Sequence, residues 1–406
     1  MHRLHAHRSA PASTNDEVKG LKRNRAIGLA AATIMIVGIV LAVLQADRLK
    51  EAFSPASSEW QNRADAAQAE LAKSFWDEKR GLFNNAAPCI AQLCTDPFNY
   101  WWLAHAVDVL VDGYERTGNE AYKERLSKLY QGILDRNAGV MINDYYDDME
   151  WMALAWLRAY DVTKEERYKQ AALELWADIK AGWNEEMGGG IAWRKEQLDY
   201  KNTPANAPAV ILAARLYRHF GNDEDLAWAK KIYDWQTKTL VDPESGLVWD
   251  GINRTGDGAV DKEWKFTYGQ GVYIGAGVEL YDATKESRYL DDARRTAGNL
   301  KTDFLSPATG MLPSEGDGDG GLFKGVLVRY LGELIEADPK RREPIELLKT
   351  NGDSLWEYGK SSESALFSNS WAQSPDAVVQ LSTQLSGMML LEQLAKFEKN
   401  GTLDER

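Results

Sequence analysis

Segments that are apolar on all sides alternate along the chain with segments that carry a charged face. Apolar stretches cover residues 149–160, 208–220 and 271–281, while residues 121–134 and 227–240 mix apolar positions at helical spacing with lysines and acidic residues. A helix that is apolar all round is buried, and an amphipathic helix lies at the surface. The alternation therefore predicts pairs of one buried and one exposed helix over most of the chain.

A short turn motif recurs between these helix pairs. An acidic or polar residue is followed four positions later by glycine, and usually then by an apolar residue. The motif starts lie 58, 49, 58 and 64 residues apart, and the glycines are Gly81, Gly139, Gly188, Gly246 and Gly310. A glycine at a fixed place indicates a tight turn that needs a positive φ.

The repeat leads to a specific architecture. At roughly 57 residues a unit, six helical hairpins fit between residue 59 and the C-terminus. We predict an all-α fold, an (α/α)6 toroid over residues 59–406, with the buried helices as an inner ring. A helix near residues 384–394 would close the ring beside the first hairpin. A linear stack of hairpins is the alternative, because six units alone do not exclude it.

Composition narrows the chemistry. The chain has 406 residues and a net charge of -13, which argues against nucleic acid or another polyanion as a ligand. It carries 15 Trp and 17 Tyr, which can form a core but also offer flat platforms for sugars. With five His and two Cys, a zinc site is not expected, and we predict no metal and no cofactor. Cys89 and Cys94 are either a local disulfide, if the domain is exported, or two free thiols.

The N-terminal region predicts a membrane anchor. Residues 26–44 form an uncharged run of 19 residues, preceded by four basic residues between positions 19 and 25. Such a helix spans about 28 Å, close to the thickness of the hydrocarbon core. We predict a cytoplasmic tail (1–25), an uncleaved transmembrane signal anchor (26–44), a stalk (45–58) and a domain outside the cell membrane. A buried core helix is the alternative, and the domain would be secreted if the anchor were cleaved.

The stretch "NDYYDDMEWMALAW", residues 143–156, holds the strongest candidate chemistry. Asp147 and Asp148 follow the Gly139 turn and open an apolar helix, so they should lie in its first turn and face the mouth of the toroid. They could simply stabilise the helix dipole, by about 0.3 to 1 kcal/mol. Two adjacent like charges among aromatic rings are costly for that purpose alone. As an acid/base couple, one carboxylate would stay ionised while its charge raises the pKa of the other.

This motif resembles the double-aspartate signature of glycoside hydrolase family 76, the α-1,6-mannanases and related fungal wall proteins. Five further segments resemble the family in the same order: residues 100–108, 188–194, 200–217, 267–281 and 322–334. The resemblance implies an (α/α)6 barrel that cleaves α-1,6-mannosidic linkages with retention, through a glycosyl-enzyme intermediate. It implies Asp147 as the nucleophile and Asp148 as the general acid and then base.

Several other residues are candidates for binding an α-mannan. Tyr146 lies beside the aspartates, and Trp101, Trp102 and Trp193 offer rings for stacking, although each ring could equally belong to the core. Polar side chains at the starts of predicted inner helices could hydrogen-bond sugar hydroxyls or serve as helix caps. They are Asn202, Tyr268 and Gln270.

Three classes of function remain open from sequence. The first is a cell-surface glycosidase, or a transglycosylase that uses the same intermediate during wall assembly, in either case acting on α-mannan. The second is an isoprenoid-type lyase, for which "DDME" is half a metal motif; no second motif is present and the acidic body argues against diphosphate. The third is a non-catalytic glycan-binding wall protein. We expect a monomer in each case.

Overall fold

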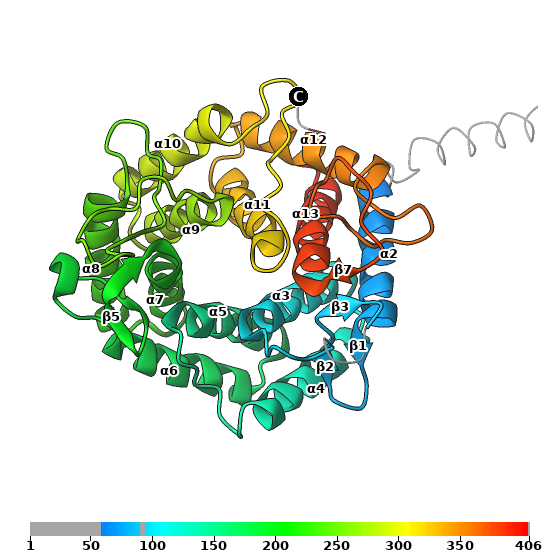
Figure 1. Cartoon of the computed structure of the whole chain (residues 1–406), viewed down its shortest axis with the longest axis horizontal. Helices are drawn as coiled ribbons and strands as arrows, with labels where there is room; N and C mark the ends of the chain where they lie inside the picture. Colours follow the sequence, from blue (N-terminus) through cyan, green and yellow to red (C-terminus); the bar gives the residue numbers. More distant parts are fainter. Residues whose placement is uncertain (1–57, 90–93, 405–406) are drawn as a thin grey trace, which may run out of the picture. The chain divides into compact units, whose positions relative to one another are not determined.

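Twelve α-helices lie within residues 58–89 and 94–404, which are the residues that this computed structural model describes. Figure 1 shows them as two concentric rings. The inner ring consists of α3 (Tyr100–Thr117), α5 (Tyr146–Thr163), α7 (Ala207–Phe220), α9 (Thr267–Thr284), α11 (Gly320–Ala337) and α13 (Leu381–Lys399). The outer ring consists of α2 (Glu59–Ser74), α4 (Ala121–Arg136), α6 (Glu166–Ala181), α8 (Asp223–Leu240), α10 (Ser287–Asp303) and α12 (Glu343–Glu357).

The inner ring is closed. Each inner helix contacts the next in chain order, and α13 contacts α3 and α2 as well as α11. At the junction, the Glu398 carboxylate accepts the backbone N–H groups of Trp60 and Gln61, at 3.2 and 3.1 Å. The toroid predicted from the repeat is therefore confirmed for the described residues, and the linear stack is wrong.

Burial follows the hydrophobic pattern. Every residue of α9 from Thr267 to Leu280 is buried, because neighbours on both sides and an outer helix cover it. Outer helix α4 buries only Leu126, Leu129, Gly132 and Ile133, which lie on one face. The prediction of buried inner and amphipathic outer helices is confirmed.

The connections differ between the two ends of the ring. Where inner helices α3, α5, α7 and α9 end, a single residue in the left-handed region makes the turn to the next outer helix. At the other end, where the inner helices begin, longer loops carry short strands that the sequence did not predict. The strands are β1 (Trp76–Asp77), β2 (Leu82–Phe83), β3 (Ala86–Ala87), β4 (Ala192–Arg194), β5 (Gln197–Asn202), β6 (Gly251–Ile252) and β7 (Val379–Gln380).

These strands pair antiparallel in three small sheets, β1–β2, β3–β7 and β4–β5–β6. The β3–β7 pair joins Ala86 to Gln380, so it ties the first long loop to the last one. The sheet β4–β5–β6 joins the loop before α7 to the loop before α9. The end at which the inner helices begin is thus a set of mutually braced loops.

The recurrent glycine turns adopt the predicted conformation. All five glycines have a positive φ, between 64° at Gly81 and 84° at Gly139. In the first turn, the Gly81 N–H donates to the carbonyl of Asp77, whose side chain accepts the N–H groups of Lys79 and Arg80. The turn lies against Gly132 of α4, where an added Cβ would stand 2.4 Å from the Gly81 oxygen.

The predicted tail (1–25), the predicted anchor (26–44) and the predicted stalk up to residue 57 lie outside the described residues. Among the helices that are described, none is long and apolar enough to cross a membrane. Residues Glu59–Arg406 form a compact unit of their own. Within it, Cys89 and Cys94 are joined by a disulfide, which decides between the two alternatives for these thiols.

Candidate active site

Asp147 and Asp148 stand in the first turn of α5, as the sequence predicts. The helix begins at Tyr146, just after the Gly139 turn, at the end of the ring that carries the long loops. Both side chains are partly exposed. Their position places two carboxyls near the positive end of the α5 dipole, within reach of solvent and of ligands.

The Asp147 carboxyl receives two hydrogen bonds. Its Oδ2 accepts the indole N–H of Trp193 at 3.0 Å, and its Oδ1 accepts the backbone N–H of Asp148 at 3.0 Å. Burial raises the pKa of Asp147 to about 7, while the two hydrogen bonds oppose that rise and nearby carboxylates add to it. At neutral pH this group is therefore poised between its charged and neutral forms.

The Asp148 carboxyl has a different environment. No hydrogen bond reaches it from the described residues. Its pKa is raised well above the usual range, first by burial and then by the negative charges of Asp147 and Asp319. Because only Asp147 has donors that stabilise a negative charge, Asp147 is the carboxyl that ionises and Asp148 the one that keeps a proton.

Two carboxylates that sequence reasoning missed complete the site. Asp250 is buried and accepts the hydroxyl of Tyr268 at 2.8 Å and that of Tyr200 at 3.3 Å, and it pairs with Arg254. Asp319, just before α11, accepts two indole N–H groups at 2.8 and 2.9 Å. Both follow a glycine turn and precede an inner helix, as Asp147 does, so the repeat itself was the signal.

The structure brings four of the predicted binding residues to this cluster. Trp193 donates to Asp147, and Tyr268 donates to Asp250. Trp101 and Trp102 donate to Asp319; Trp101 is partly exposed, whereas Trp102 is buried and has its ring in the core. Trp101, Trp193 and Tyr268 are therefore beside the carboxyls, and Trp102 supports Asp319 from behind.

The other three predicted binding residues are engaged elsewhere. The ring of Tyr146 lies against Gly182, at the end of the outer helix α6. Asn202 caps a short helical turn by accepting the N–H of Ala205. The Gln270 amide bonds both the N–H and the carbonyl of Val248, which fixes the loop before α9. The amides of Asn202 and Gln270 thus stabilise the loops through hydrogen bonds, and Gln270 is fully buried.

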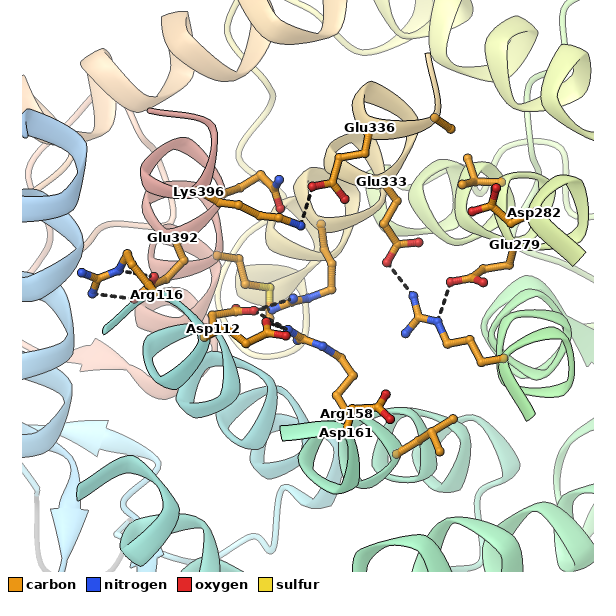
Figure 2. Close-up of a pocket in the computed structure, with 18 of the residues that line it drawn as sticks. Asp112, Arg116, Arg158, Asp161, Glu279, Asp282, Glu333, Glu336, Glu392 and Lys396 are labelled. Atoms are coloured by element: carbon orange, nitrogen blue, oxygen red, sulfur yellow. Dashed lines mark hydrogen bonds and ion pairs between the residues drawn. The ribbon is translucent and has the colours of Figure 1, made fainter. Parts of the chain in front are cut away.

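A cavity of about 950 Å³ lies at the opposite end of the ring, where the inner helices finish (Figure 2). Its lining is densely charged and contains no Trp, Tyr or Phe. The carboxylates there are paired with cations: Arg215 reaches Glu279 and Glu333 at 2.6 Å each, and Lys396 pairs with Glu336.

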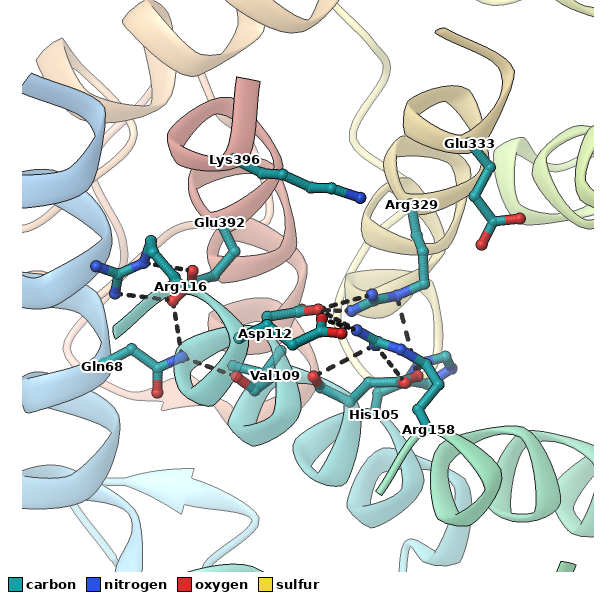
Figure 3. A network of polar contacts seen from close by, with 12 residues as sticks. Gln68, His105, Val109, Asp112, Arg116, Arg158, Arg329, Glu333, Glu392 and Lys396 are labelled. Atoms are coloured by element: carbon teal, nitrogen blue, oxygen red, sulfur yellow. Dashed lines mark hydrogen bonds and ion pairs between the residues drawn. The ribbon is translucent and has the colours of Figure 1, made fainter. Parts of the chain in front are cut away.

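Figure 3 follows this charge network between helices. Arg158 of α5 and Arg329 of α11 both bind Asp112 of α3, at 2.7 Å each. Burial alone would raise the pKa of Asp112, but the two guanidinium groups hold it below the usual range. The Asp112 carboxylate is thus held ionised near neutral pH. The pKa values of Asp147 and Asp148 are raised instead, and no cation among the described residues pairs with either carboxyl.

The model of Glycosyl hydrolase family 76 matches residues 50–405. This chain belongs to glycosyl hydrolase family 76. The family member DCW1 of Candida glabrata, a mannan endo-1,6-alpha-mannosidase, is 24% identical over 273 residues. That match covers 62% of this chain and 61% of DCW1, so the chain spans about three fifths of the length of this curated relative.

Solved structures of the family cover more of the chain. The GH76A alpha-1,6-mannanase of Salegentibacter sp. HEL1_6 is 42% identical in an inactive variant, with a TM-score of 0.78 over 83% of this chain and 99% of that one. That variant has two adjacent aspartates replaced by alanine and is in complex with alpha-1,6-mannotetrose. The Lin0763 protein from Listeria innocua is 43% identical, with a TM-score of 0.80 over 84% of this chain and 98% of that one.

Proposed function

We propose that this protein is a glycoside hydrolase that cleaves α-1,6-mannosidic linkages with retention of configuration. One observation carries the proposal: two adjacent carboxyls stand at the start of α5, and only Asp147 has hydrogen-bond donors that stabilise its negative charge. A retaining glycosidase needs one ionised and one protonated carboxyl beside the same bond. The family relationship and the mannan-degrading relatives support the choice of substrate.

The residues divide the reaction as follows. The ionised Asp147 attacks the anomeric carbon, while Asp148 gives its proton to the departing glycosidic oxygen, so that the C–O bond breaks as the ester forms. Asp148, now ionised, then takes a proton from water, which attacks the anomeric carbon and breaks its bond to the Asp147 oxygen, so that Asp147 is released as a carboxylate. Trp193 keeps the attacking carboxylate oriented through its indole N–H. The exposed Asp319, whose Oδ1 accepts both indole N–H groups, offers its Oδ2 to a sugar hydroxyl, while the buried Asp250 orients Tyr268 and Tyr200.

A direct test uses the purified full-length chain and linear α-1,6-mannan. We expect short oligosaccharides whose newly formed ends are first released in the α configuration, as followed by anomeric proton NMR. Asp147→Ala and Asp148→Ala should each remove this activity. Products longer than the substrate would instead indicate transglycosylation. If neither variant lost activity, the assignment of the pair would be wrong; if the wild type bound mannan without cleaving it, the protein would be a glycan-binding protein.

We also propose that residues 26–44 anchor the protein in the cell membrane, with the catalytic unit outside. The uncharged run, the basic residues before it and the Cys89–Cys94 disulfide support this arrangement. In cell fractions, the protein should stay with membranes after alkaline carbonate washing, and protease added to intact cells should degrade the domain. Recovery from the medium of a shortened chain that lacks residues 26–44 would show that the anchor is cleaved, and a protease-resistant domain would contradict the orientation.

A further inference from the structure

Trp264 is the most exposed tryptophan of the protein. All fifteen tryptophans lie in the described residues; the other fourteen are buried or partly buried, whereas 46% of the surface of Trp264 is accessible. It lies in the loop before α9, at the end of the ring that holds the aspartate pair. Its neighbours in sequence are charged and exposed, so Trp264 is not part of an apolar patch of the kind that binds proteins.

The Trp264 ring is held in a fixed place relative to the carboxyl cluster. The backbone carbonyl of Trp264 accepts the backbone N–H of Asp250 at 2.8 Å, and the backbone N–H of Trp264 donates to the carbonyl of Asp261 at 2.9 Å. The guanidinium of Arg254 lies 4.1 Å from the ring centre, and Arg254 also forms an ion pair with Asp250. Exposure therefore does not come from a loose loop, since backbone and side chain both tie Trp264 to a residue of the site.

A series of packed contacts, which passes through the buried Tyr200, forms a wall between this ring and the aspartate pair. Arg254 lies 5.1 Å from the ring of Tyr200 as well, and Tyr200 packs edge-on against Trp193 at 5.8 Å. Trp193 in turn donates to Asp147. Of these rings, Trp264 is exposed and Trp193 is partly exposed, and the partly exposed Arg254 carries N–H donors. An exposed ring beside such donors suits a pyranose, which offers an apolar face and a rim of hydroxyls.

From this wall we infer an accessory sugar subsite, in which Trp264 stacks on a mannose residue remote from the scissile bond and Arg254 donates to its hydroxyls. The inference rests on the proposed function and extends it: longer α-1,6-mannooligosaccharides would bind more tightly than short ones because they reach Trp264. An active site that gains affinity from mannose units far from the scissile bond favours cleavage in the interior of a polymer.

The test measures binding, so that it does not depend on turnover. Titration calorimetry of the full chain, in an Asp148→Asn background, compares α-1,6-mannohexaose with α-1,6-mannotriose. We expect Trp264→Ala to weaken hexaose binding about tenfold and to reduce the ratio of hexaose to triose affinity, with Trp264→Tyr in between. Phe220→Ala is the matched control, since Phe220 is also exposed but is the last residue of α7, at the other end of the ring.

The outcomes separate the two ideas. If Trp264→Ala binds hexaose as tightly as its parent, or if Phe220→Ala weakens binding equally, the subsite is overturned whatever the activity. If the wild type cleaves no mannan but its hexaose binding depends on Trp264, the subsite stands and the proposed hydrolysis fails. If hexaose binds no more tightly than triose in the parent, the subsite is also overturned. A melting curve for each variant confirms that the fold is intact.

Discussion

Replacing Asp147 by asparagine should stabilise this protein at neutral pH, although it should abolish hydrolysis. The Asp147 carboxyl is partly buried, faces other carboxylates and has no cationic partner, and its pKa is raised to about 7. The folded protein therefore holds a proton that the unfolded chain has already lost between about pH 4 and pH 7. The free energy of unfolding of the wild type therefore falls as the pH rises from about 4 to about 7. Asparagine does not ionise, so the variant does not lose this stability.

The size of the effect follows from the pKa change. Raising a carboxyl pKa from 3.8 to about 7 costs the folded state about 4 kcal/mol above pH 7, as an upper limit. Partial exposure and relaxation reduce this, so we expect a gain of about 1–3 kcal/mol for Asp147→Asn at pH 8. For a domain of this length, that gain raises the melting temperature by about 2–4 °C.

The assay is urea and thermal unfolding of wild type and Asp147→Asn at pH values between 4 and 8. The two curves should meet near pH 4 and separate as the pH rises. Asp144→Asn is the control, because Asp144 is exposed in the loop just before α5 and outside the site. If Asp147 were only a helix-dipole residue, asparagine would destabilise the protein by about 0.3–1 kcal/mol at pH 8. That sign, or parallel pH curves, would refute the reasoning.

Three further changes test other parts of the structure. Trp193→Phe removes a donor to ionised Asp147, so the acidic limb of kcat/KM should move about one pH unit upward; an unmoved limb would contradict this. Arg158→Met leaves the buried Asp108 and Asp112 with Arg329 as their one remaining guanidinium partner and should lower the unfolding free energy by about 3 kcal/mol, unlike the exposed Lys128→Met; equal effects in urea melts would disprove it. Gly132→Ala should cost about 1–3 kcal/mol in the same melts, because its Cβ would press on the first glycine turn, and an unchanged midpoint would count against that packing.

The fold was largely predictable because its pattern is repeated. Continuous apolar stretches and a glycine turn every hairpin define inner helices, outer helices and their order, and the structure follows them. The aspartate pair was also predictable, since both residues are adjacent in one helix start. Features that recur locally in the sequence can be predicted without knowing which distant residues come into contact.

The rest of the site depends on contacts between distant hairpins. Asp319 approaches the pair from a loop that lies 171 positions beyond Asp148, and no local pattern records that meeting. Gln270 shows the opposite problem, because an amide at a helix start suits a sugar and a loop carbonyl equally well. The charge network at the far end was likewise unforeseen, since Arg329 finds Asp112 across more than 200 residues.

Closure of the ring has a consequence for how the protein is made. The contacts of Glu398 with Trp60 and Gln61 join positions 338 and 337 residues apart, and the β3–β7 pair adds a second link of the same kind. Such separations mean a high contact order and slow folding. During synthesis, the apolar surfaces of α3 and α11 that pack against α13 stay uncovered until α13 has been made. Of the described helices, α13 leaves the ribosome last and completes the ring, so truncation of this one helix should yield an aggregation-prone chain rather than a smaller enzyme.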